Sequence, residues 1–256
     1  MRIKGLLAAL LVISLLLPAA HAGKRKQFYA DCDTHDYTCM RVRRGQSWES
    51  LFPDDRVREI VMRVNHRNSQ LWSGLIVKVP NTIASGDLLD YSPFPRQIQA
   101  PQEKVIIFDP RRYAWAAYGA DGQLVRWGPA TGGQNWCNDI EEDCHTKTGR
   151  FRIYSMGNSS CVSSKFPIPD GGAPMPYCMY FNGGQALHGS PGGVMLGNES
   201  HGCVRMFVRD AEWMRYEFVD PPDETNDFRG TEVIVLPYTN TEPDTAAQLD
   251  SDTPDS

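Results

Sequence analysis

The spacing of the cysteines constrains the fold of this chain more than any other feature of its sequence. Six of them can pair locally, because two pairs are each seven residues apart and a third pair brackets a loop rich in proline and glycine. In an oxidising compartment an odd total leaves at least one thiol free or paired between chains. Sequence alone does not decide among the possible connectivities, so local pairing is a prediction. The expected pairs are Cys32 with Cys39, Cys137 with Cys144 and Cys161 with Cys178, and Cys203 is left over.

The N-terminus has the layout of a secretory signal. Arg2 and Lys4 precede an uncharged apolar stretch at 6–17, and "AHA" follows at 20–22. This order of basic, apolar and small-residue regions is typical of a cleaved signal peptide. The apolar stretch is too short to cross a bilayer, which takes about 20 apolar residues. We therefore predict a signal peptide at 1–22, no membrane-spanning segment, and a location in the periplasm or cell envelope.

The charge balance argues against a nucleic-acid partner. The chain of 256 residues has a formal net charge of -5, and residues 237–256 hold five acidic residues and no Lys or Arg. The remainder is close to neutral, so no basic face for nucleic acid is indicated. The acidic tail at 238–256 cannot bury a core and is expected to be disordered. Residues 23–40 are polar and are expected to form a leader held by the predicted Cys32–Cys39 bridge.

Residues 41–81 are predicted to form a small α+β module. Apolar residues at 57, 60, 61 and 64 mark one face of a helix, and residues 75–79 are typical of a short strand ended by a proline. The order of "GQSW", a single Asn and "LWSGLIVKVP" resembles the LysM module, which implies binding to peptidoglycan-like glycans. Trp48 and Trp72 are then candidates for stacking on sugars, although both could simply belong to a core. A structural spacer with a buried helix is the alternative.

The rest of the chain is predicted to be mostly β. Residues 82–103 contain three prolines and little periodicity, which suits an extended linker. From residue 104 to 237, short β-rich segments are divided by Gly, Asp and Pro, as in an antiparallel or mixed sheet closed into a sandwich or barrel. Only residues 208–218 indicate a clear helix after the sheet begins. The expected strands lie at 105–108, 113–118, 124–127, 149–154, 179–187 and 232–236.

The residues best suited to take part in catalysis lie in "LHGS" at 187–190 and "NESHGCVRM" at 198–206. A cysteine becomes a nucleophile when a base or positive charge lies near it. His188 ends an apolar strand, and a Gly/Pro-rich turn can fold the chain back to bring Cys203 to it. The amides around Gly202 can point at a developing oxyanion. One alternative is a structural histidine with an inert cysteine. Another is a metal site made of His188, His201 and Cys203. No HExxH-type pattern supports such a site, so we predict no metal or cofactor.

The segments "ALHGS" and "SHGCVRM" resemble the signature of L,D-transpeptidases with the YkuD-type catalytic domain. The match extends over roughly residues 104–237 and includes "TKTGRFRIY", "PMPYCMYFNGGQALHG" and "GTEVIVL". Lys147 stands where this family usually has a proline. The resemblance implies a mostly β catalytic domain of sandwich or barrel type, preceded here by the small α+β module, with the active site beneath a flap formed by strands and their connecting loop.

The resemblance also implies roles for individual residues. Cys203 would be the nucleophile and His188 the general base, oriented by the backbone carbonyl of Gly189. His201 and Gly202 would shape the oxyanion pocket. The residues expected to support or bind the substrate are Ser200, Tyr180 and Arg205, the last through a carboxylate.

The implied reaction is acyl transfer on peptidoglycan stem peptides. Cys203 would form a thioester with a stem tetrapeptide, releasing D-alanine, and an amine would resolve it to give a 3-3 cross-link or an attached protein such as a lysine-bearing lipoprotein. Water as acceptor would instead give an L,D-carboxypeptidase. The alternatives from another class are a wall-binding protein without catalytic activity and a surface adhesin. A covalent adduct of a carbapenem on Cys203 would favour the enzyme.

Overall fold

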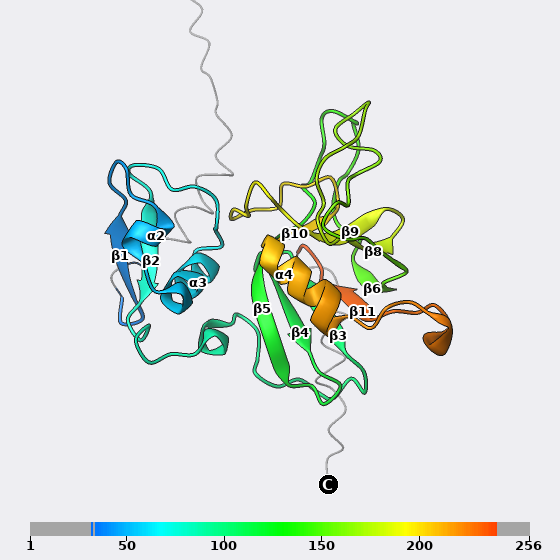
Figure 1. Cartoon of the computed structure of the whole chain (residues 1–256), viewed down its shortest axis with the longest axis horizontal. Helices are drawn as coiled ribbons and strands as arrows, with labels where there is room; N and C mark the ends of the chain where they lie inside the picture. Colours follow the sequence, from blue (N-terminus) through cyan, green and yellow to red (C-terminus); the bar gives the residue numbers. More distant parts are fainter. Residues whose placement is uncertain (1–31, 33, 240–256) are drawn as a thin grey trace, which may run out of the picture.

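The structure is a computed structural model that describes residue 32 and residues 34–239. The predicted signal peptide, most of the leader, and the tail from residue 240 onwards lie outside the described residues. An N-terminal module, blue to cyan in Figure 1, precedes a larger domain coloured green to orange. Within the described part of the chain, every helix is too short or too polar to span a bilayer.

The N-terminal module contains two strands and two helices. Strands β1 (Tyr37–Arg41) and β2 (Ile76–Pro80) pair antiparallel. Helices α2 (Trp48–Leu51) and α3 (Asp55–Val64) lie between them in the chain, and the side chains of Ser47 and Asp54 cap their N-termini. The predicted apolar face is confirmed, because Ile60, Val61 and Val64 of α3 are buried.

Strand β1 overlaps the end of the predicted leader. Residues 37–40 of the polar segment expected at 23–40 belong to this strand, which begins two residues before the disulfide partner Cys39. The strand is half-exposed, so its sequence lacks the apolar run that marks a buried strand. Pairing with β2 and the Cys32–Cys39 disulfide order it instead.

The segment at 82–103 is packed rather than free. It contains a short 3-10 helix, η1 (Leu88–Tyr91), and a buried Phe94. The indole N–H of Trp127 donates to the Leu88 carbonyl at 2.8 Å, and the Tyr118 hydroxyl donates to the Pro95 carbonyl at 2.9 Å. The predicted linker therefore covers one face of the sheet that follows it.

The larger domain is built on one curled sheet, which confirms the mostly β prediction. Its strand order is β6-β11-β3-β4-β5-β10-β9-β8-β7. The pairs β3/β11 and β9/β10 are parallel and the other pairs are antiparallel. The Tyr154 amide, between β6 and β7, donates to the Tyr180 carbonyl of β8 at 2.9 Å, so the two ends of the sheet approach each other as a half-barrel. The strands are β3 (Val105–Asp109), β4 (Ala114–Tyr118), β5 (Leu124–Thr131), β6 (Gly149–Arg152), β7 (Ser155–Met156), β8 (Met179–Asn182), β9 (Gln185–Gly189), β10 (Val204–Met206) and β11 (Glu232–Val235).

Both faces of the central strands are covered. In β3, Ile106 and Phe108 belong to one apolar cluster while Val105 and Ile107 belong to another on the opposite face. The alternation follows from the two-residue repeat of a strand. Burial on both sides explains why this strand is a continuous apolar run in the sequence.

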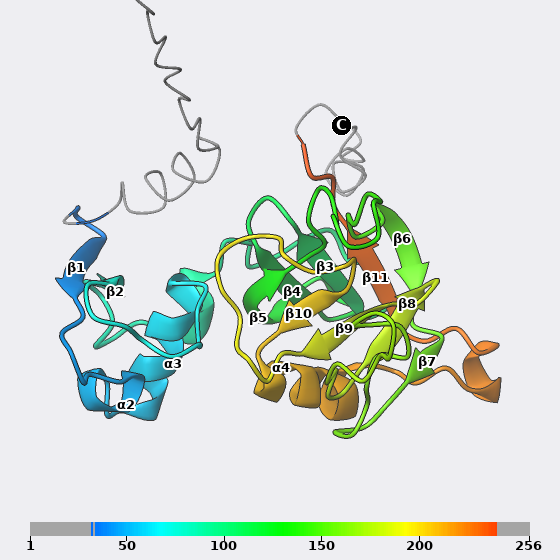
Figure 2. The same cartoon turned by 90° about the horizontal axis from the view of Figure 1, so that it is seen from above.

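The helix predicted at 208–218 is confirmed as α4 (Val208–Trp213) continued by a π-helical turn, η2 (Met214–Phe218). It lies along the sheet beside β9 and β10 (Figure 2). Ala211, Met214 and Phe218 pack into the same apolar cluster as Ile106 and Phe108. One further 3-10 turn, η3 (Glu224–Asn226), precedes β11.

A buried charge cluster joins the module to the larger domain. Arg63 of α3 is fully buried, and its guanidinium donates to both carboxylate oxygens of Asp210 in α4, at 2.6 and 2.9 Å. It also donates to the Trp127 carbonyl at 2.5 Å. A side chain at Gly128 would place its Cβ only 2.4 Å from the Arg63 guanidinium, so glycine permits this close approach. The two parts are therefore fastened by specific polar contacts.

Candidate functional site

Neighbouring strands place the predicted catalytic residues on one face of the sheet. In the parallel pair of β9 and β10, Arg205 lies directly opposite His188. Cys203 immediately precedes β10, two residues before Arg205, so the two-residue repeat directs both side chains to the same face. Tyr180 of β8 pairs with Ala186 of β9, two residues before His188, and it shares that face.

The imidazole of His188 is held in one orientation by the backbone. The ring is buried, and its Nδ1–H donates to the Gly189 carbonyl at 2.8 Å. A carbonyl can only accept, so Nδ1 carries the proton and Nε2 keeps its lone pair. The pKa of His188 is lowered to about 4, mainly by burial. The hydrogen bond to Gly189 acts to raise this pKa, and the positive charge of Arg205 acts to lower it further. The ring is therefore a neutral base near pH 7.

Cys203 is the free thiol of the molecule. The three predicted disulfides are confirmed, and Cys203 is partly buried with its Sγ–H directed at the Gly184 carbonyl, 3.8 Å away. Burial raises the pKa of this thiol, while the Ala186 amide and the Arg205 charge act to lower it. Arg205 lies opposite His188 in the strand register and two residues after Cys203, and its positive charge acts on both groups.

The turn before the thiol is fixed by Ser200. The buried Ser200 hydroxyl donates to the Cys203 carbonyl at 2.5 Å and accepts the Gly202 N–H at 3.0 Å. Gly202 has φ +110°, and a Cβ there would lie 2.7 Å from the Gln185 side-chain nitrogen, so this position requires glycine. The Gly202 amide has the Ser200 hydroxyl as its partner, and the expected role of Gly202 in the oxyanion pocket stays a prediction.

The His201 ring contacts two separate loops. Its Nε2–H donates to the Asp139 carboxylate at 2.8 Å, and its ring packs on Phe166 with 4.3 Å between ring centroids. The expected role of His201 in shaping the oxyanion pocket stays a prediction.

Two disulfide-closed loops border the site. The Cys137–Cys144 bridge closes one, and the Cys161–Cys178 bridge closes the other. The second bridge packs in one cluster with Ala186, Tyr180 and Cys203. The Tyr180 hydroxyl lies 4.0 Å from the Cys161 sulfur. The longer loop therefore lies directly against the thiol.

A group of three potential metal-binding atoms occurs beside the site. Ligand atoms of Cys137, Cys144 and His201 lie within 4.8 Å of one another. The two sulfurs are joined in a disulfide, so neither is the thiolate that a metal site of this kind uses.

The two tryptophans of the module differ in exposure. Trp48 is 4% exposed and donates its indole N–H to the Ser69 carbonyl at 2.9 Å, so it belongs to the core and offers no face to a sugar. Trp72 is 49% exposed, and the Arg67 guanidinium lies 4.6 Å from its ring centroid. Only Trp72 remains a candidate for glycan stacking.

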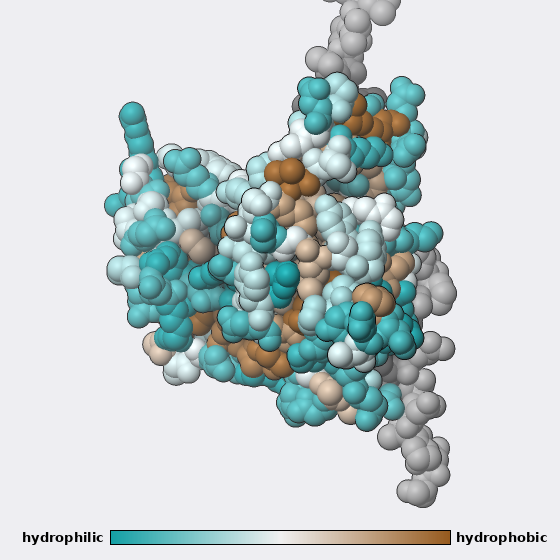
Figure 3. All heavy atoms as spheres, turned by 45° about the vertical axis from the view of Figure 1, so that its right-hand side comes forward, coloured by the Kyte–Doolittle hydropathy of each residue, from teal (hydrophilic) through white to brown (hydrophobic). Residues whose placement is uncertain are grey.

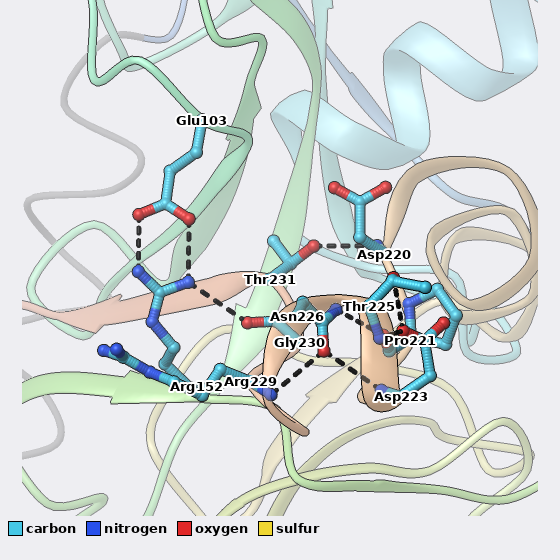
Figure 4. Close-up of a pocket in the computed structure, with 10 residues that line it drawn as sticks. All are labelled: Glu103, Arg152, Asp220, Pro221, Asp223, Thr225, Asn226, Arg229, Gly230 and Thr231. Atoms are coloured by element: carbon cyan, nitrogen blue, oxygen red, sulfur yellow. Dashed lines mark hydrogen bonds and ion pairs between the residues drawn. The ribbon is translucent and has the colours of Figure 1, made fainter.

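A polar pocket lies apart from these residues (Figure 4). Its volume is about 370 Å³, and it is lined by charged side chains near β6 and β11, including Glu103, Arg152, Asp220 and Arg229. Glu103 and Arg152 form a two-point ion pair with distances of 2.5 and 2.7 Å. None of the predicted catalytic residues lines this pocket, and two of its charged side chains, Glu103 and Arg152, pair with each other.

Sequence reasoning missed three contributors to the site: the Ala186 amide, Asp139 and Phe166. The cysteines at 137, 144, 161 and 178 indicated closed loops over the site, but no sequence pattern singled out which loop residues meet His201. The pairing of β9 with the short β10, which brings Ala186 to Cys203, was not predicted either.

A comparison with protein families places this chain in a known family. The sequence model of the family described as YkuD, L,D-transpeptidase catalytic domain, matches residues 103–235, about half of the chain. It does not reach residues 41–81, so the LysM-like interpretation of the module stays a prediction. A search of curated proteins gave no match.

Several solved L,D-transpeptidases are similar to this chain. The enzyme from Xylanimonas cellulosilytica is 26% identical with a TM-score of 0.48, over 65% of this chain and 74% of that one. The enzyme from Stackebrandtia nassauensis is 22% identical with a TM-score of 0.43, over 57% and 61%. The enzyme from Mycobacterium smegmatis is 20% identical with a TM-score of 0.41, over 53% and 59%. The last two alignments span less than two thirds of those chains. On the family match, this chain belongs to the L,D-transpeptidases with the YkuD-type catalytic domain.

Proposed function

We propose that this protein is a cysteine-dependent L,D-transpeptidase that acts on peptidoglycan stem peptides in the cell envelope. The observation that carries the proposal is the fixed tautomer of His188, whose Nδ1–H is bound to the Gly189 carbonyl so that Nε2 can accept a proton. The free thiol of Cys203 lies on the same face of the neighbouring strand. A base and a nucleophile in this arrangement suit acyl transfer.

The first half-reaction forms a thioester. Cys203 attacks the carbonyl of the third residue of a stem tetrapeptide while its proton passes to Nε2 of His188. The tetrahedral intermediate then collapses, the C–N bond to the terminal D-alanine breaks, and the imidazolium returns the proton to the leaving amine. The low pKa of His188 and the raised pKa of Cys203 mean that both groups are neutral before attack, so proton transfer accompanies bond formation.

The second half-reaction transfers the acyl group. The amine of a neighbouring stem attacks the thioester, His188 takes its proton, and Cys203 is released as the leaving group and reprotonated. Arg205, opposite His188, suits a substrate carboxylate because a guanidinium offers a planar fork of donors. Tyr180 borders the same space and is proposed to contact the substrate. A lysine amine of an envelope protein, or water, would enter the same step as an alternative acceptor.

The decisive experiment is a Cys203→Ala variant incubated with purified disaccharide tetrapeptide. Loss of the nucleophile leaves His188 nothing to activate, so D-alanine release should fall at least about a thousandfold. Mass spectrometry of the products also identifies the acceptor, since a cross-linked dimer, a lysine conjugate and a tripeptide differ in mass. The matched control is a Cys32→Ala, Cys39→Ala double variant, which removes cysteines remote from the site and should retain activity. Release of D-alanine by Cys203→Ala at the wild-type rate would refute the proposal.

A further inference from the structure

His201 joins two loops that are far apart in the sequence. Its Nε2–H donates to Asp139 in the Cys137–Cys144 loop, and its ring packs on Phe166 in the Cys161–Cys178 loop. Both partners lie within these loops, Asp139 two residues after Cys137 and Phe166 five residues after Cys161. The imidazole also holds the pKa of Asp139 below its ordinary value, through the hydrogen bond. One side chain therefore connects both loops.

Each loop is ordered separately, and His201 links the two. A disulfide fixes the ends of each loop, and backbone hydrogen bonds order it internally, as from the Ser163 N–H to the Ala173 carbonyl at 2.8 Å and from the Cys137 N–H to the Glu142 carbonyl at 2.9 Å. The loops project from the same side of the catalytic domain in Figure 1. Apolar patches on the molecular surface are separated by hydrophilic residues in Figure 3. Val162 and Ile168 of the longer loop are about half exposed. Because His201 contacts both loops, its contacts are a means of holding them together.

The joined loops border the thiol. His201 lies two residues before Cys203, and the Ser200 hydroxyl fixes the turn between them through the Gly202 amide and the Cys203 carbonyl. On the other side, the Cys161–Cys178 bridge packs in one cluster with Cys203. A movement of either loop would therefore change the space in front of the sulfur.

We propose that Asp139, His201 and Phe166 form a latch that sets the width of the opening to Cys203 and so limits the size of ligand that reaches the thiol. His201 is in this view a positioning residue, acting through the two loops rather than on the reacting atoms. The significance of the latch for substrate selection rests on the proposed function, but access to the thiol is measurable without turnover.

The test compares two maleimides of different size on the full chain. N-methylmaleimide and fluorescein-5-maleimide share one reaction with Cys203 and differ in bulk. In Asp139→Ala and in Phe166→Ala, the fluorescein probe should react with Cys203 about fivefold faster than in the wild type. The first variant loses a partly exposed charge-assisted hydrogen bond, and the second loses one ring contact. The rate for the small probe should stay within about twofold of wild type. Asp139→Asn, which can still accept a hydrogen bond, should fall between wild type and Asp139→Ala.

The matched control is Glu142→Gln, which removes an exposed negative charge from the same loop. It should leave both labelling rates unchanged. The latch is refuted if Asp139→Ala and Phe166→Ala leave both labelling rates unchanged. It is also refuted if both probes react faster by the same factor, because equal acceleration indicates general exposure of the sulfur. Failure of D-alanine release with an intact size effect would instead refute the proposed reaction and leave the latch standing.

Discussion

The N-terminal module and the catalytic domain are stabilised in different ways. Among the described residues, the module has one apolar cluster around residues such as Val61 and Val77, whereas the catalytic domain has three: one on each face of its central strands and a smaller one around Cys178 and Ala186. Small units bury too little apolar surface to be stable alone without further links. The module has a disulfide and the buried Arg63–Asp210 contact as such links. The comparison indicates that the module depends on the junction, while the catalytic domain relies on its own core.

The largest effect should come from breaking the junction. Asp210→Ala leaves the fully buried Arg63 guanidinium without its main partner, so the free energy of unfolding should fall by about 3–5 kcal/mol. Urea unfolding measures this loss, and limited proteolysis should show earlier cleavage in the module.

The control for the junction is Asp55→Ala, which removes the exposed ion pair with Arg58 on the same helix α3. Exposed pairs are worth little, so its cost should stay below about 1 kcal/mol. Equal losses in Asp210→Ala and Asp55→Ala would show that the module does not depend on the junction.

Lowering the pH is a second way to test the contact between the module and the catalytic domain. His66 donates its Nδ1–H to the Tyr113 carbonyl, and burial lowers its pKa from 6.5 to about 4. Between these values the unfolded chain binds a proton that the folded chain excludes, so stability is present above pH 6.5 and is lost as the pH falls toward about 4. One such group contributes a slope of at most about 1.4 kcal/mol per pH unit.

The variant His66→Asn should make the dependence of the unfolding free energy on pH shallower in that window. The remaining slope should include His188, whose pKa is also lowered to about 4 by burial in the catalytic domain. Urea unfolding at a series of pH values measures both. An unchanged slope in His66→Asn would mean that the junction does not exclude the proton.

The smallest effect concerns the contact between the module and the loop before Cys203. The backbone N–H of Val194 donates to the side-chain oxygen of Asn68 at 2.8 Å, and the backbone N–H of Asn68 donates to the Val194 carbonyl at 3.4 Å. Asn68→Ala should cost about 1 kcal/mol and slow acylation of Cys203 by about twofold, because the loop that leads to the thiol loses a support.

The control for this contact is Asn81→Ala. Asn81 binds the His35 carbonyl within the module at 2.8 Å, so the variant should lose similar stability without slowing acylation. Acylation rates measured with one carbapenem, together with urea unfolding, separate the two cases. Slower acylation in both variants would show that general loosening of the module, rather than this contact, affects the thiol.

Local patterns predicted much of the fold. The apolar series at 57–64 predicted helix α3, and residues 105–108 and 232–236 predicted strands β3 and β11. The segment at 179–187 was predicted as one strand and is a hairpin, because Gly183 and Gly184 turn the chain between β8 and β9. Strand β10 was missed because it has only three residues and depends on pairing with β5 and β9.

The cysteine spacing in the sequence favoured, among several possible connectivities, the three disulfides between cysteines close in the chain and left Cys203 as the free thiol, and the structure confirms both predictions. Short loops favour such pairings because closing them costs little entropy. Only the tertiary structure decided the direction of the His201 ring toward Asp139 and the burial of Arg63 against Asp210. Each depends on groups brought together by the packed sheet and its loops, and no local pattern encodes a partner that the chain reaches only after folding.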